Sequence, residues 1–146
     1  MWEIEKLSMI VCLCFLAVCT YWDIRRRTLP VVLLREGTLL SVLYVVCSGR
    51  EYWYLHLAGA GVGLFFLLVS KITKEAIGYG DSVAIMILGG YLGFWKVVGV
   101  LAAAFFTSGV CSVILAFRGR VKTMPFFPFL TLGYILMLAE QRGGVL

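Results

Sequence analysis

The chain has 146 residues, of which 62% are hydrophobic and 14% charged, and its formal net charge is +5. A soluble globular domain has about 45–50% apolar and about 25% charged residues, so this composition excludes a soluble protein and indicates an integral membrane protein. The basic residues lie in short segments between apolar runs, where membrane topology and anionic lipid explain them. We therefore expect membrane lipids and no nucleic acid as partners.

The apolar runs predict an all-α, polytopic membrane protein with about six transmembrane helices. A spanning helix needs about 20 largely apolar residues, with a range of about 17–25. We expect a single transmembrane domain over residues 1–146, because no polar segment is long enough for a separate domain. The expected spans are Leu7–Trp22, Val31–Cys47, Tyr52–Ser70, Ile77–Trp95, Val97–Phe117 and Met124–Ala139. Pro30 suits the start of the second helix, where its missing N–H is not needed.

The distribution of Lys and Arg predicts the orientation of these helices. Cytoplasmic loops are enriched in both residues. The segments after the first, third and fifth spans hold eight, and the opposite side holds four: Arg25, Arg26, Arg27, Lys71, Lys74, Arg118, Arg120 and Lys122 against Lys6, Arg50, Lys96 and Arg142. With an even number of spans, both termini are then expected outside.

The only two aspartates, Asp23 and Asp81, are the candidate catalytic residues. Asp81 opens the fourth apolar run, and an acidic side chain in a span costs about 2.5–3.5 kcal/mol at the helix centre, which makes it a functional candidate. It follows Gly78 and Gly80, which indicate a bent or closely approached backbone. Asp23 closes the first run, so both aspartates are expected at the cytoplasmic end of the membrane.

Two carboxyl groups that share a site cannot easily both ionise, so the pair holds an acid and a base at the same pH. The base activates a water and the acid protonates the carbonyl oxygen or the leaving amine, which hydrolyses a peptide bond without a metal or cofactor. The five cysteines lie in apolar runs without a Cys-x-x-Cys pair, and His56 is the single histidine. We therefore expect no metal site and no cofactor.

Three segments carry a resemblance to a known family. They are Asp23–Val31 (DIRRRTLPV), Gly78–Asp81 (GYGD) with Leu88–Gly93 (LGGYLG) after it, and Pro125–Gly133 (PFFPFLTLG). Their order and positions resemble the Gly-x-Gly-Asp intramembrane aspartic proteases, and among them the type IV prepilin peptidases. The chain departs from the family pattern at three positions that bear on substrate fit and local geometry: Val31 replaces Asn, Val83 replaces Lys and Phe127 replaces Gly. It resembles the short members that lack the N-terminal methyltransferase domain.

The resemblance implies an aspartic endopeptidase of the bacterial inner membrane, with its active site facing the cytoplasm. Asp23 and Asp81 would be catalytic, and the supporting motif residues would be Gly78, Tyr79, Gly80, Pro30, Pro125 and Pro128. The substrates would be prepilin-like precursors, which lose a short basic leader. Because the loops of this chain are themselves basic, Glu36 and Glu75 are the acidic candidates for binding that leader.

Two alternatives use the same residues differently. Gly78-Tyr79-Gly80 is similar to the Thr-Val-Gly-Tyr-Gly filter of potassium channels, but Ala76 and Ile77 stand in place of the first two residues. A presenilin-like protease with other substrates has similar chemistry, but its Pro-Ala-Leu motif is absent. The sequence does not predict the oligomeric state.

Overall fold

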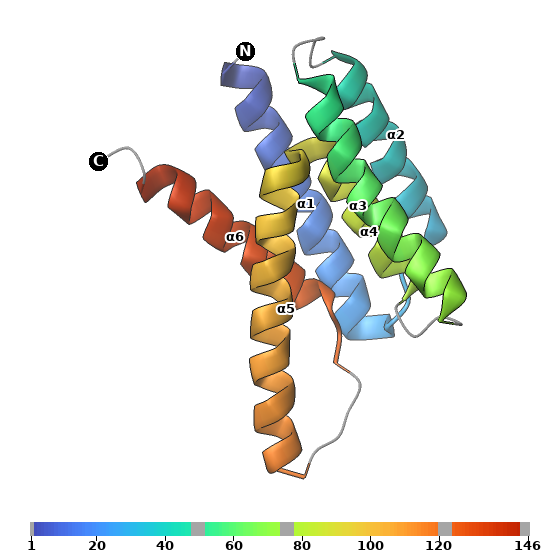
Figure 1. The fold of residues 1–146 in the computed structure, drawn as a ribbon, viewed down its shortest axis with the longest axis vertical. Coiled ribbons are helices and arrows are strands. Elements are labelled where there is room, and N and C mark those ends of the chain that lie inside the picture. Colours follow the sequence, from blue (N-terminus) through green and yellow to red (C-terminus); the bar gives the residue numbers. More distant parts are fainter. Residues whose placement is uncertain (1, 48–51, 74–77, 120–123, 144–146) are drawn as a thin grey trace.

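The computed structural model describes residues 2–47, 52–73, 78–119 and 124–143, and this part of the chain folds into helices without any strand (Figure 1). The helices are α1 (Trp2–Arg26), α2 (Val31–Cys47), α3 (Trp53–Ile72), α4 (Tyr79–Leu92), α5 (Phe94–Phe117) and α6 (Phe127–Gly143). They follow the six predicted apolar runs in order, which confirms the all-α fold class. The second run coincides with α2 at both ends.

Three of the helices, α1, α3 and α5, are long and apolar enough to cross a membrane, over Glu5–Arg26, Trp53–Ile72 and Phe94–Phe117. The others are shorter: α2 and α6 have 17 residues each and α4 has 14. At 1.5 Å per residue α4 is about 21 Å long, less than the roughly 30 Å of bilayer hydrocarbon. Half of its residues are buried against other helices, so protein rather than lipid surrounds much of α4.

A single residue, Gly93, joins α4 to α5. Its φ of +78° lies in the left-handed region that glycine adopts without steric cost. Its N–H donates to the carbonyl of Gly89 at 2.9 Å, and its own carbonyl accepts from the N–H of Val97 at 3.1 Å. The chain therefore turns within the predicted run Ile77–Trp95, so that α4 ends earlier and α5 begins earlier than expected.

Small residues bring α3 and α4 into backbone contact. A Cβ added to Gly89 would lie 2.0 Å from the carbonyl oxygen of Gly59, and one added to Gly63 would lie 2.2 Å from Cα of Met86. Side chains at these positions would force the two helices apart. This close approach agrees with the small-residue packing that is typical of membrane helices.

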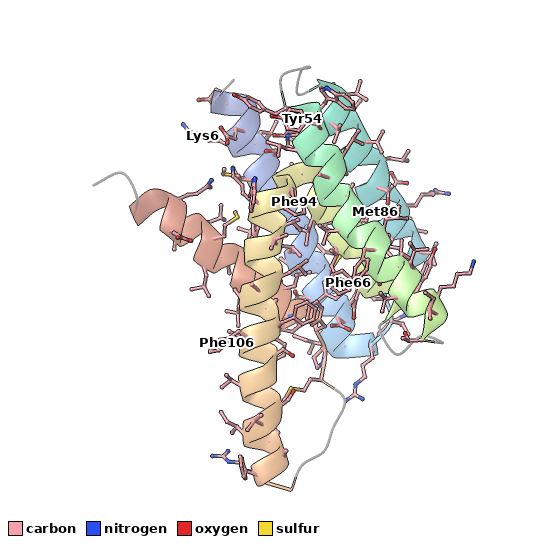
Figure 2. The ribbon with its side chains drawn as sticks, viewed as in Figure 1. Lys6, Tyr54, Phe66, Met86, Phe94 and Phe106 are labelled. Atoms are coloured by element: carbon pink, nitrogen blue, oxygen red, sulfur yellow. The ribbon has the colours of Figure 1, made fainter. Side chains whose placement is uncertain are left out.

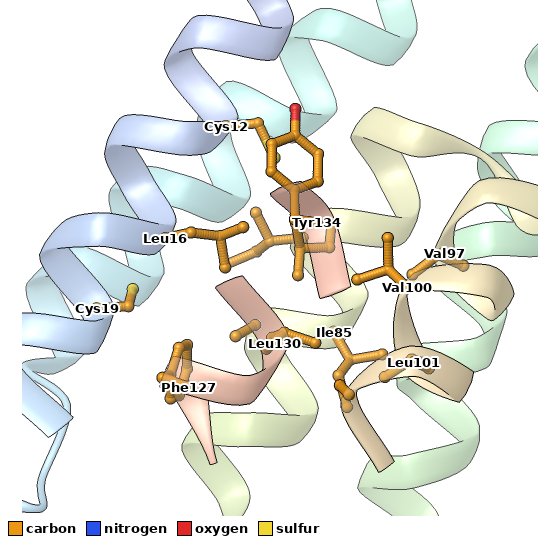
Figure 3. Packing of buried hydrophobic residues seen from close by; sticks show 14 of the residues in the cluster. Cys12, Leu16, Cys19, Ile85, Val97, Val100, Leu101, Phe127, Leu130 and Tyr134 are labelled. Carbon is orange, nitrogen blue, oxygen red and sulfur yellow. The ribbon is translucent and has the colours of Figure 1, made fainter. Parts of the chain in front are cut away.

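The core lies where α1, α4, α5 and α6 meet (Figure 3). Its fully buried side chains include Leu16, Leu88, Val100, Leu130 and Tyr134. Side-chain hydroxyls join α6 to α1 in this core: those of Thr20 and Thr131 lie 2.7 Å apart, and that of Tyr134 donates to the carbonyl of Met9 at 3.1 Å.

The C-terminal half of α5 extends beyond the end of α1 (Figure 1). Large apolar side chains are exposed there, among them Phe106 (Figure 2), which is 72% exposed, and Phe117, which is 89% exposed. Exposed phenylalanines on a helix of this length and hydropathy are what contact with lipid requires.

Candidate active site

Asp23 lies in the last turn of α1, and the chain reverses direction directly after it. The N–H of Arg27 donates to the carbonyl of Asp23 at 2.9 Å, and Arg27 then takes a φ of +52°. Pro30 follows this turn, and its carbonyl accepts from the N–H groups of Leu33 and Leu34, which starts α2. The half-buried Asp23 carboxylate therefore lies beside the turn that joins α1 to α2.

Asp81 lies in the first turn of α4, which begins directly after Gly78. The carbonyl of Gly78 accepts hydrogen bonds from the main-chain N–H of Ser82 at 3.2 Å and from its hydroxyl at 3.3 Å. Ser82 is fully buried, whereas Asp81 is half-buried. The helix start is thus fixed on its inner side by Ser82, and the residue directly before Ser82 carries the carboxylate.

The two glycines before Asp81 have different spatial roles. A Cβ on Gly78 would lie 3.1 Å from Oδ2 of Asp81, so a side chain there would press on the carboxylate. A Cβ on Gly80 would lie 2.9 Å from Cδ1 of Leu29, in the turn between α1 and α2. The first glycine leaves room for the carboxylate, and the second lets the start of α4 pack against the turn that follows Asp23.

Both aspartates line one cavity of about 630 Å³. The structure therefore brings together the two residues that the sequence singles out. The other residues that line the cavity are Arg27, Thr28, Leu29, Val31, Leu34, Arg35, Thr38, Gly78, Tyr79, Gly80 and Val83.

The main-chain amide of Phe127 is a site group that the sequence reasoning missed. Its N–H donates to Oδ2 of Asp23 at 3.2 Å, although the two residues are 104 positions apart. Phe127 is the first residue of α6, between Pro125 and Pro128, and its ring is fully buried. Pro128 fits the first helical turn, which needs no N–H from it. The motif Pro125–Gly133, which contains Phe127, was the sequence signal that could have indicated this contact. The structure shows that a main-chain group of this motif binds the carboxylate of Asp23.

The α2 face turned to the cavity carries Val31, Leu34, Arg35 and Thr38, at the spacing of one helix face. Glu36 does not line the cavity; its carboxylate pairs with the guanidinium of Arg35 at 3.5 Å. Glu75, the other predicted leader-binding residue, lies outside the described residues. Arg35, which the sequence reasoning did not select, is therefore the charged α2 residue on the cavity wall.

Tyr79 also lines the cavity and is 63% exposed, as expected for a residue at an entrance. Within the described ranges, no three His, Cys, Asp or Glu side chains are grouped so that they could hold a metal ion. His56 is remote from the aspartates, since it lines a different cavity.

No individually curated protein and no solved structure matches this chain significantly. The sequence profile of the type IV leader peptidase family matches residues 10–116, a range that includes Asp23, Asp81 and the helices α2 to α4. This match confirms the resemblance carried by the sequence motifs, and the chain belongs to the type IV leader peptidase family.

Proposed function

We propose that the chain is an aspartic endopeptidase that removes the short basic leader from prepilin-like precursors at the cytoplasmic edge of the bacterial inner membrane. Asp23 and Asp81 are the catalytic pair. The observation that carries the proposal is that these two residues, from the end of α1 and the start of α4, line the same cavity. Membership of a leader peptidase family supplies the reaction class.

Hydrolysis needs one of the two carboxyl groups ionised and the other protonated. The ionised carboxylate takes a proton from a water in the cavity while the water oxygen attacks the scissile carbonyl carbon, and the protonated carboxyl gives its proton to the carbonyl oxygen. The resulting gem-diol collapses as its C–N bond breaks: the leaving amine takes the proton held by one carboxyl group, and a hydroxyl of the gem-diol returns a proton to the other, which restores the pair. Either carboxyl group can take either role, so the proposal assigns the acid and base roles to the pair.

Three features support a peptide substrate that enters from the side of α2. Val31 and Tyr79 are 78% and 63% exposed on the cavity wall, so this wall is accessible from outside the bundle. Thr38 supplies a hydroxyl that can bind a peptide carbonyl or N–H. The hydrogen bond from Phe127 fixes one carboxylate before substrate arrives, which is the preorganisation that catalysis by positioned groups requires.

The channel alternative receives no support from the backbone. Tyr79 and Gly80 are the first two residues of α4. A potassium filter needs successive carbonyls pointing into a pore. Helical residues point their carbonyls along the helix axis instead, so Gly78-Tyr79-Gly80 is explained by the packing of Asp81 and Leu29.

The test is a cleavage assay with the purified protein in lipid nanodiscs and a purified prepilin-like precursor. Mass spectrometry of the products locates the cut. We expect a single cut between the basic leader and the apolar helix, by the wild-type protein and not by Asp81→Asn. Cleavage that persists in the Asp81→Asn protein would refute an aspartic mechanism at this site.

A further inference from the structure

A second cavity, of about 610 Å³, lies at the other end of the bundle, where α1, α3 and α5 begin (Figure 1). It shares no lining residue with the cavity of Asp23 and Asp81. Its volume is in the range of small-molecule sites, about 300–1,000 Å³. Peptide hydrolysis at the aspartates does not use this cavity, so it calls for a separate explanation.

Two opposite charges lie on the wall of this cavity. Lys96 of α5 and Glu5 of α1 are its charged residues within the described part of the chain, and Nζ of Lys96 lies 3.8 Å from Oε1 of Glu5. Charge-assisted hydrogen bonds are about 2.7–2.9 Å long, so this pair is loose. The side chains are 38% and 55% exposed, which leaves both charges accessible to a further group.

The neighbouring wall consists of hydrogen-bond acceptors and aromatic faces. Nδ1 of His56 lies 2.9 Å from the carbonyl oxygen of Gly90, which can only accept, so Nδ1 carries the proton and Nε2 of the neutral ring is an acceptor. The Tyr44 ring lies 5.7 Å from the His56 ring and 5.3 Å from the Tyr91 ring, centroid to centroid. Aromatic faces attract ammonium groups of every kind, and the acceptor Nε2 adds a preference for an ammonium that carries N–H donors.

We propose that this cavity binds the headgroup of phosphatidylethanolamine. The lipid phosphate pairs with Lys96, and the primary ammonium pairs with Glu5 against the rings of Tyr44 and Tyr91. This headgroup carries its two charges a few ångströms apart, as the loose Glu5–Lys96 pair does. Trp95, 75% exposed on the same wall, is the residue type that marks the headgroup level of a bilayer.

The proposal predicts discrimination between lipids. Phosphatidylcholine has a quaternary ammonium without N–H donors, so it cannot donate a hydrogen bond to Glu5 or His56. Phosphatidylglycerol has the phosphate but no cation, so it places a hydroxyl where Glu5 and the tyrosine rings favour positive charge. Phosphatidylcholine keeps the contacts with Lys96 and the tyrosine rings but loses the hydrogen bonds of the ammonium, and phosphatidylglycerol keeps only the contact with Lys96. We expect each to bind about tenfold more weakly than phosphatidylethanolamine.

The experiment titrates the full chain, purified in detergent, with dihexanoyl forms of the three lipids and measures binding by native mass spectrometry. The variants are Glu5→Gln, at an exposed position, and Lys96→Gln, at a half-buried one. Lys6→Gln is the matched control, because Lys6 lies at the same end of the bundle (Figure 2), pairs with Glu3 at 3.8 Å and does not line the cavity. Soluble phosphoethanolamine is titrated in parallel.

We expect the wild type and Lys6→Gln to prefer phosphatidylethanolamine by about tenfold, and Glu5→Gln and Lys96→Gln to lose that preference. Equal binding of the three lipids, or a loss in Lys6→Gln equal to that in Lys96→Gln, would overturn the site. Tighter binding of soluble phosphoethanolamine than of the lipid would overturn the lipid as its ligand. None of these readouts depends on peptidase activity.

Discussion

The main-chain N–H of Phe127 donates a hydrogen bond to Oδ2 of Asp23 at 3.2 Å, so the first residue of α6 holds the carboxylate at the end of α1. Phe127→Pro removes this donor, and the first helical position tolerates proline. Phe127→Leu keeps both the donor and an apolar side chain. We expect Phe127→Pro to lower kcat about tenfold, in line with about 1.5 kcal/mol for a hydrogen bond to a charged group, and Phe127→Leu to lower it much less.

The measurement for this pair is kcat in the precursor cleavage assay, with the thermal unfolding midpoint of each protein as a control for folding. If both variants unfold at similar temperatures and cleave at similar rates, the amide does not contribute to catalysis by orienting Asp23.

The aspartate pair is tested by Asp23→Asn and Asp81→Asn. Each substitution keeps size and polarity but removes a group that exchanges a proton, so each should lower cleavage about a thousandfold or more. The double variant should be little worse than either single variant, because residues that act as one unit are not additive. Single-turnover cleavage is measured alongside protein levels in the membrane fraction, which should be unchanged. Full activity in Asp23→Asn would contradict a mechanism that needs both aspartates.

The space beside Gly78 is tested by adding one methyl group. In Gly78→Ala the new Cβ lies at about the position that is 3.1 Å from Oδ2 of Asp81, so the carboxylate must shift by a few tenths of an ångström. Misplaced reacting groups cost rate steeply, and we expect about a tenfold loss of kcat. Gly99→Ala is the control, since its Cβ meets no atom within 4 Å. Equal rates in the two variants would show that the carboxylate tolerates the methyl group.

Substitutions of the neighbours Arg35 and Glu36 test which of the two residues contributes to substrate binding. The sequence favours Glu36 as a leader-binding residue, whereas Arg35 is the one of the two that lines the cavity. We expect Arg35→Gln to change KM severalfold and Glu36→Gln to change it less, with kcat close to that of the wild type in both. Initial rates over a range of precursor concentrations give both constants. A larger effect at Glu36 would restore the leader-binding role expected from the sequence.

Orientation in the membrane is tested with single cysteines at positions 72 and 119, in a background without the native cysteines. Ile72 ends α3 and Gly119 follows α5, and both are exposed. The eight-to-four asymmetry of basic residues predicts that both positions face the cytoplasm. An impermeant maleimide should label them only after the membrane is opened. Labelling in intact cells at both positions would reverse the topology.

The sequence predicts the helical fold well, because apolar runs of spanning length have few other structures in a bilayer. It misplaces the junction of α4 and α5, since the left-handed φ of Gly93 leaves no mark in an unbroken apolar run. It also selects Glu36 over Arg35 by charge alone. Adjacent residues on a helix point about 100° apart, and the rotation of α2 about its axis depends on packing against other helices.

The catalytic role of the aspartates stays a prediction. Their positions in the fold are explained by tertiary contacts, which the sequence motifs alone do not reveal. Gly80 packs closely on Leu29, and Phe127 reaches Asp23 from the far end of the chain. Contacts of this kind join segments distant in sequence. A motif marks that such contacts exist, and only the fold shows which atoms make them.

The stagger of the two longest helices has a consequence for the lipid. α1 and α5 have 25 and 24 residues, yet α5 reaches further at the end where α1 carries Asp23, Arg25 and Arg26 (Figure 1). A flat bilayer thick enough to cover the exposed Phe117 would immerse those arginines in hydrocarbon. We therefore expect lipid around α1 and the short α4 to thin to match them. Such a dimple would shorten the distance that water and a polar peptide backbone travel to the aspartates, so that under the proposed function the deformed membrane would form part of the approach to the scissile bond.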